Sequence, residues 1–305
     1  MHVVFWKELA DHFGSKRFII FFFLILLVAG ASVYLAGQGL RQNPEGTGSF
    51  VFLRLFTSSS GGLPSFLSFL AFFGPLIAVL LGFDAVNREF NRGTVSRVLA
   101  QPIYRHSWIN GKFLAGFAAV ALALAGIVLI IFGLGLFTLG FAPDGGELAR
   151  MAAFFVIGIV YLGFWLSLGI LFSIVFRQAA SSALTSIALW LFFTLFLYMI
   201  ADQIAPVRLD SAPELWTQHE HIRDLVLRLS PVALFEEATS AVLIPSYRGL
   251  GVAEMLTQAQ VPTNPLPLGQ SFLIVWPQLV GLIALTSICF AVSYILFMRR
   301  EIRTT

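Results

Sequence analysis

Six apolar runs without a single Asp, Glu, Lys or Arg residue divide the chain into membrane-like and polar parts. A helix needs about 20 apolar residues to cross the ~30 Å hydrocarbon core of a bilayer, and every run reaches that length. The pattern therefore predicts an all-α polytopic membrane protein that forms a single transmembrane domain over residues 1–305. The six predicted transmembrane helices cover residues 18–37, 64–83, 113–142, 151–176, 178–201 and 271–298.

Composition and charge distribution support this architecture and orient it. The chain is 58% hydrophobic and 11% charged, against roughly 25% charged residues in soluble domains. Basic residues concentrate in segments 1–17, 84–112 and 299–305, which all lie on one side of a six-helix topology. Because cytoplasmic segments of membrane proteins are enriched in Lys and Arg, both termini are predicted to be cytoplasmic. The net charge of +3 follows from this topology and does not indicate nucleic-acid binding.

Two polar segments carry helical patterns of their own. In residues 1–17, Trp6, Leu9 and Phe13 recur at helical spacing, which predicts an interfacial helix on the cytoplasmic leaflet. The outer loop, residues 202–270, is predicted to hold a helix over 213–229 and a second over 232–244. Ser230 and Pro231 are typical of the start of a helix, and about 13 residues are too few to span, so the second helix is predicted to be re-entrant or interfacial.

The connection between the second and third apolar runs, residues 84–112, is crowded with charge. The second helix is predicted to continue to Asn91 or Arg92, where Gly93 supplies the left-handed turn that ends helices. Thr94 is then expected to cap a short helix over 95–100, and Ser107 to cap the next transmembrane helix. This predicts a helical finger with Val95, Val98 and Leu99 free to contact a partner. Two short helices lying on the lipid surface are the plainer alternative.

The same connection resembles the cytoplasmic loop of ABC-2 type permeases, the membrane subunits of ATP-binding-cassette exporters. That resemblance implies a coupling loop that docks on the ATPase and in which Glu89 directs its charge to the partner. The matching and neighbouring residues are Asp84, Arg88, Glu89, Arg92, Gly93, Thr94, Val95, Arg97, Leu99, Pro102 and Arg105, followed by Gly111-Lys112. It also implies two ATPase subunits that bind ATP and Mg²⁺, a second permease copy or paralogue, surrounding membrane lipid, and a place in a prokaryotic inner membrane.

Other sequence patterns that resemble nucleotide-binding or metal sites lack the residues or the spacing that such sites require. Gly111-Lys112 lacks the earlier Gly and the following Ser or Thr of a phosphate-binding loop, so no nucleotide-binding domain is expected in this chain. His219 and His221 are two residues apart and point to different sides of a helix, so no metal site is expected. The apolar runs hold no acid–base pair, which argues against an enzyme with catalytic residues and against an ion-coupled secondary transporter. A non-transporting membrane scaffold that serves an ATPase stays open.

Overall fold

The computed structural model describes residues 1–42, 50–60, 62–95, 101, 104–205, 219, 222–246 and 265–300. Within these residues, six helices are long and apolar enough to cross a membrane, which confirms the predicted all-α polytopic fold. They are α2 (Lys16–Gln42), α4 with α5 (Phe66–Gly82 and Asn87–Asn91), α7 (Arg105–Leu139), α8 (Gly145–Val175), α9 to α10 (Ala179–Ile204) and α14 (Leu268–Arg299). Three further helices, α1 (His2–Phe13), α3 (Arg54–Thr57) and α12 (Pro231–Leu243), lie outside these spans.

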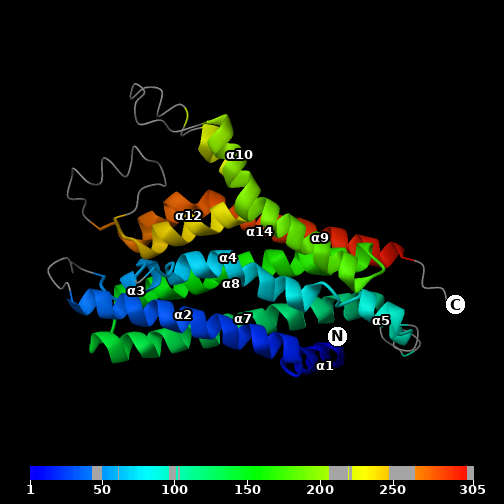
Figure 1. Cartoon of the computed structure of the whole chain (residues 1–305). Helices are drawn as coiled ribbons and strands as arrows, with labels where there is room; N and C mark the ends of the chain where they lie inside the picture. The colour runs from blue at the N-terminus through cyan, green and yellow to red at the C-terminus, as the bar shows by residue number, and fades with distance from the viewer. Residues whose placement is uncertain are drawn as a thin grey trace.

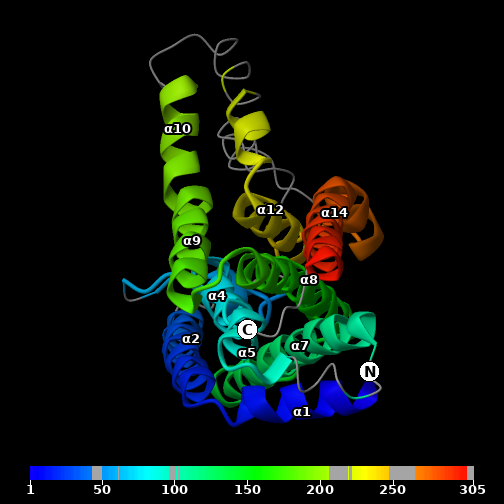
Figure 2. The ribbon, with the colours of Figure 1, turned by 90° about the vertical axis from the view of Figure 1, so that its right-hand side faces the viewer.

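The long helices run side by side, so the bundle has two ends (Figure 1). One end, called here the α5 end, holds α1, α5 and the C-terminus of α14. The opposite end, called the α12 end, holds α3, α12 and the N-terminus of α14. Viewed along the bundle, α8 lies between α4, α7 and α14, while α9 and α10 lean away from the rest (Figure 2). The arrangement makes α8 the central helix, against which α4, α7, α9, α12 and α14 pack.

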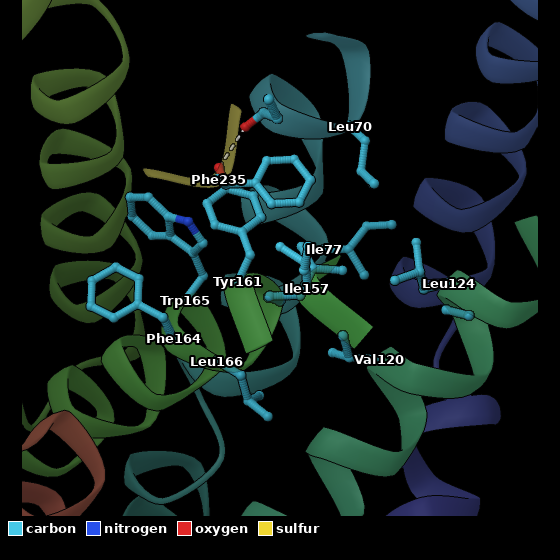
Figure 3. Close-up of a cluster of buried hydrophobic side chains, with 14 of the residues drawn as sticks. Leu70, Ile77, Val120, Leu124, Ile157, Tyr161, Phe164, Trp165, Leu166 and Phe235 are labelled. Carbon is cyan, nitrogen blue, oxygen red and sulfur yellow. Dashed lines mark hydrogen bonds between the residues drawn. The ribbon is translucent and has the colours of Figure 1, made fainter. Parts of the chain in front are cut away.

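A side chain of α8 replaces a backbone hydrogen bond that a proline removes from α4. Pro75 lies inside α4 and has no N–H, so the carbonyl of Ala71 loses its helical donor. The Tyr161 hydroxyl of α8 donates to that carbonyl at 2.6 Å. The Tyr161 ring also stacks on Phe235 of α12 at 4.2 Å between ring centroids (Figure 3). One buried side chain therefore joins α4, α8 and α12.

Helices α4 and α8 approach closely where two glycines meet. A Cβ added to Gly82 would lie 2.8 Å from the Leu166 carbonyl oxygen, and one added to Gly169 would lie 3.2 Å from the Gly82 Cα. Neither position leaves room for a side chain. Small residues allow this kind of backbone contact between membrane helices. Alanines at four-residue spacing in α7 are buried as well: Ala115, Ala119 and Ala123.

The fifth span contains a local widening of the helix. Residues Phe192–Phe196 form a π-helical turn, η2, between α9 and α10. The carbonyl of Phe193 in this turn accepts a hydrogen bond from the Ser230 hydroxyl at 3.1 Å. Ser230 also caps α12, accepting from the backbone N–H of Val232 and Ala233. The predicted start of this helix at Ser230 and Pro231 is confirmed, and the cap fixes α12 to the π-helical turn.

The other end of α12 is held by a buried arginine. The Arg150 guanidinium of α8 is 2% exposed and donates to the Val242 carbonyl at 2.7 Å, to the Ser271 hydroxyl at 3.3 Å and to the Leu266 carbonyl. A cation at a helix C-terminus also complements the helix dipole. Of the predicted outer helix 213–229, residues 222–227 are helical and most of the remainder lies outside the described residues.

Helix α1 lies across the α5 end, and its buried face differs from the apolar face that the sequence pattern indicates. Its buried residues are Val4, Glu8 and Leu9, whereas Trp6 is 56% and Phe13 is 41% exposed. The inward face thus carries an acidic residue. The exposed aromatic side chains suit the headgroup layer of a bilayer, which is the environment predicted for this helix.

Candidate functional site

The charged connection (residues 84–112) begins with a break in the second span. The second span reaches Asn91 as predicted, but a turn that was not predicted separates α4, which ends at Gly82, from α5. The backbone N–H groups of Val86 and Asn87 donate to the hydroxyl of Ser173, at 2.8 and 3.1 Å. Ser173 is a fully buried residue of α8. A distant side chain thereby satisfies two backbone donors near the break and fixes the base of α5 to the central helix.

The far end of α5 follows the predicted turn chemistry. Gly93 has a φ of +66°, so the left-handed turn predicted there is confirmed. The Thr94 hydroxyl donates to the Glu89 carbonyl at 3.1 Å, which folds the chain back on α5. Thr94 and Val95 begin a helical turn, and the predicted site residues Arg97, Leu99 and Pro102 lie outside the described residues. Val95 is 2% exposed and contributes to the core, so it is not free to contact a partner as predicted.

A buried ion cluster joins α5 to α1 and α7. The Lys112 ammonium of α7 donates to the carboxylates of Glu89 and Glu8, with both N–O distances at 2.8 Å. The Lys112 side chain is 2% exposed, that of Glu8 is 9% and that of Glu89 is 13%. Lys7 adds a second, more exposed ammonium at 2.9 Å from Glu8 and 3.3 Å from Glu89. The ring of Trp108 lies 4.7 Å from the Lys112 nitrogen.

The two lysines hold the Glu8 carboxylate in its charged form. Burial alone would raise the pKa of Glu8, but Lys112 and Lys7 outweigh burial and lower it to about 2. Burial alone would likewise lower the pKa of Lys7, yet the carboxylates of Glu8 and Glu89 raise it. A charge taken out of water is stable only where partners compensate it, and here two cations face two anions. The cluster is therefore a mutually dependent unit.

The prediction that Glu89 directs its charge to a partner is therefore wrong, because its carboxylate faces Lys112 and Lys7. The separations along the chain explain why local patterns miss the cluster. Glu89 lies 23 residues from Lys112 and 82 residues from Lys7. One signal was present: Lys112 comes directly before an apolar run of membrane-spanning length. A lysine there must snorkel to water or find a carboxylate.

Comparison with known proteins decides the family of the chain. Residues 2–302 match the family described as ABC-2 family transporter protein. The chain belongs to that ABC-2 family. Two bacterial relatives carry the name "Probable ABC transporter permease protein NosY". The one from Stutzerimonas stutzeri is 28% identical over 193 residues, which are 62% of this chain and 64% of the relative.

The second relative, from Pseudomonas aeruginosa, is 34% identical over 193 residues, which are 62% of this chain and 65% of the relative. The chain spans just under two thirds of the length of each of these ABC-2 proteins. The family match covers the charged connection and all six spans. Together with the six apolar helices, these bacterial permease relatives identify the chain as a multi-pass inner-membrane protein.

The remaining predicted site residues of this ABC-2 protein lie on the surface of the α5 end. Arg88 pairs with Asp84 at 3.5 Å, and Arg17 of α2 lies 3.8 Å from the same carboxylate. Arg92 is exposed beside the turn at Gly93. Arg105 is exposed and donates to the backbone of Arg300 at 3.4 Å, which links the start of α7 to the end of α14. Exposed arginines, Arg88, Arg92 and Arg105, thus form a basic surface at the α5 end.

The start of α7 corrects one further boundary. The helix begins at Arg105, eight residues before the predicted span, with Tyr104 at the N-cap position and no side-chain cap. Ser107 lies inside the helix and is not its cap. With a rise of about 1.5 Å per residue, the 35-residue helix is longer than the ~30 Å hydrocarbon core. Its first turns, including Lys112, belong to the charged connection rather than to the membrane core.

The described residues contain no cluster of metal-ligating side chains. Groups of three or more His, Cys, Asp or Glu side chains that could hold a metal ion do not occur among them. His219 is helical, while Glu220 and His221 of the same sequence cluster lie outside the described residues. The described contacts at the α5 end are ion pairs and hydrogen bonds that attach its helices to one another.

Proposed function

We propose that this chain is the membrane-spanning subunit of an ATP-driven exporter and that a separate ATPase subunit supplies the energy. The proposal is supported by the ABC-2 family match and by relatives named as permeases. In this arrangement ATP and Mg²⁺ bind to the ATPase, and the chain contributes no catalytic residue. The charged connection faces the cytoplasm, as do both termini, and contacts the ATPase through its basic surface.

The observation that carries this proposal is the attachment of α5 at its base. Ser173 ties the turn before α5 to α8, and the ion cluster ties Glu89 of α5 to Lys112 of α7 and Glu8 of α1. A force applied to the exposed arginines is therefore passed to three helices instead of bending a loop. Such a rigid connection is what a coupling element requires, since interfaces and packed cores transmit displacement.

Two copies of a six-helix permease, identical or paralogous, are proposed to enclose the transport pathway, with one ATPase on each. Closed two-fold pairing is the commonest symmetry of protein assemblies. Lipid surrounds the pair and covers the exposed apolar faces of α2, α9 and α10. A native mass measurement of the complex extracted from its host membrane should find two permeases with two ATPases, and a transport-active single permease would contradict the pairing.

The coupling role is tested by reversing one exposed charge at each end of the bundle. Arg92 is exposed at the α5 end, and Arg41 is exposed near the opposite end of α2. We expect Arg92→Glu to reduce co-purification of the ATPase and the stimulation of its activity by the permease. Arg41→Glu, with the same change in charge, should leave both unchanged. Equal behaviour of the two variants would refute docking at the charged connection.

A transport assay separates the exporter from a scaffold that only anchors an ATPase. Gly93→Pro cannot adopt the positive φ of the turn and should disturb the charged connection without touching the spans. In an exporter, this variant hydrolyses ATP without moving substrate when it is reconstituted in vesicles. In a scaffold, the wild-type protein itself moves no substrate, whatever candidate compound is offered.

A further inference from the structure

A cavity at the α12 end lies far from the charged connection and combines one carboxyl group with an aromatic wall. Its volume is about 380 Å³. Helix α4 contributes Ser68, Phe69, Phe72 and Phe73, the fifth span contributes Thr194 and Tyr198, and α12 contributes Val232 and Glu236, with Pro64 at the edge. Three helices that are distant in sequence thus surround a single mostly apolar space.

The walls of this cavity are built where two helices leave regular α geometry. Phe72 and Phe73 precede Pro75 in α4, and the Phe72 carbonyl accepts a hydrogen bond from the Trp190 indole at 3.0 Å. Thr194 belongs to the π-helical turn, and its hydroxyl donates to the Trp190 carbonyl at 2.6 Å. π-helical turns within α-helices occur frequently at functional sites. The distorted segments are held in place by side-chain hydrogen bonds, so the cavity is a built feature.

Among the described residues that line the cavity, Glu236 is the one charged group. Its Oε2 atom accepts a hydrogen bond from the Tyr198 hydroxyl at 2.9 Å. Burial raises the pKa of this carboxyl, and the hydrogen bond from Tyr198 offsets the effect only in part. Among the described residues, those that line the cavity include no basic side chain, and Arg223, on the segment before α12, is paired with Asp202 at 2.9 Å. Among the described residues, the partner of the carboxyl is therefore a neutral hydroxyl and not a cation.

We propose that this cavity binds the protonated amine of an amphiphile, with Glu236 as its counter-ion and the phenylalanine rings against its apolar chain. A charge-assisted hydrogen bond is about twice as strong as a neutral one, and a buried carboxylate gains most from a cation. The Ser68 and Thr194 hydroxyls are placed to accept from the remaining ammonium hydrogens. The aromatic rings of Phe69, Phe72 and Phe73 suit an alkyl chain and present ring faces that attract cations.

Binding at this site can be tested without an ATPase, because it is measured on the full chain alone. The probe is the pair dodecylammonium and dodecanol, which share a chain length and differ in charge. An apolar carbodiimide reports occupancy, since it modifies protonated carboxyl groups in apolar surroundings. Peptide mass spectrometry then distinguishes Glu236 from its neighbour Glu237, which does not line the cavity.

We expect carbodiimide to modify Glu236 and dodecylammonium to slow this modification by about tenfold, whereas dodecanol has little effect. Dodecylammonium should also raise the thermal unfolding midpoint of the wild type and of Glu237→Gln, but not of Glu236→Gln. Equal protection by the amine and the alcohol, no protection by either, or an unreactive Glu236 would each overturn the proposal. Adding phosphatidylethanolamine identifies the source of the amine: protection by it indicates a membrane lipid, and its failure where dodecylammonium protects indicates a free amphiphile.

Discussion

Replacing Lys112 with methionine tests whether the buried ion cluster holds the α5 end together. Methionine keeps the length and apolar body of the lysine but removes the ammonium that lies 2.8 Å from both Glu8 and Glu89. Two buried carboxylates then face each other with Lys7 as their remaining cation. Removing one partner from a buried ion pair costs about 3–5 kcal/mol, because the other charge stays buried without compensation.

The lower part of this range applies here. The Lys7 side chain is 57% exposed, so water screens its attraction to Glu8 and Glu89, yet it still compensates part of their charge. We therefore expect Lys112→Met to lower the free energy of unfolding by about 3 kcal/mol. The triple variant Lys112→Met, Glu8→Gln, Glu89→Gln should recover most of this loss, since neutral groups of similar shape are cheaper to bury than unpaired charges.

Equilibrium unfolding in mixed micelles, followed by tryptophan fluorescence, measures these differences. Trp108 lies against the Lys112 ammonium and reports on the cluster directly. The matched control is Lys16→Met, which removes an exposed lysine at the start of α2 and should change the free energy by less than about 0.5 kcal/mol. If Lys112→Met is as stable as Lys16→Met, or if the triple variant is less stable than Lys112→Met, the cluster does not hold the three helices together.

Three further predictions concern packing, backbone repair and pH. Gly82→Ala should destabilise the α4–α8 contact by more than about 2 kcal/mol, whereas Gly133→Ala, where a Cβ meets nothing within 4 Å, should be neutral or stabilising in thermal unfolding. Tyr161→Phe should lower the free energy of unfolding by about 1–2 kcal/mol, and by less in a Pro75→Ala background, where residue 75 regains its backbone N–H. An equal loss in both backgrounds would refute the idea that Tyr161 replaces the missing donor. The lowered pKa of Glu8 stabilises the fold fully above about pH 4.5, and this contribution should be lost between about pH 4.5 and 2, in wild type but not in Glu8→Gln.

The spans of this protein, the Ser230 cap and the turn at Gly93 could be predicted from sequence because their causes are local. A run of 20 apolar residues specifies a transmembrane helix wherever it occurs, and all six runs became helices. The Ser230 cap with Pro231 and the left-handed turn at Gly93 depend on residues within one turn of each other. Hydropathy marks where the hydrocarbon ends, however, and not where the helix ends. The predicted span starting at residue 113 is therefore a helix that starts at Arg105.

The features that sequence reasoning missed have distant partners. The break before α5 depends on Ser173, which lies 87 residues from Val86, and serine in a membrane helix usually bonds its own backbone. The inward orientation of Glu89 likewise depends on Lys112 of α7 and on Lys7 of α1, whereas local sequence, a glutamate among arginines, predicts a surface residue. Each of these contacts forms only when the helices pack.

These non-local contacts change what the charged connection can be expected to do. If Glu89 were a surface charge, its loss would weaken binding of a partner and leave the permease intact. Because Glu89 pairs with Lys112 and Lys7, its loss also removes the ion pairs that join α5 to α7 and α1, so binding and rigidity fall together. Under the proposed function, the exposed Arg92 reports on docking, and the buried cluster reports on transmission of force. Comparing Arg92→Glu with Lys112→Met therefore separates recognition of an ATPase from the mechanical response of the spans, which a substitution at Glu89 would confuse.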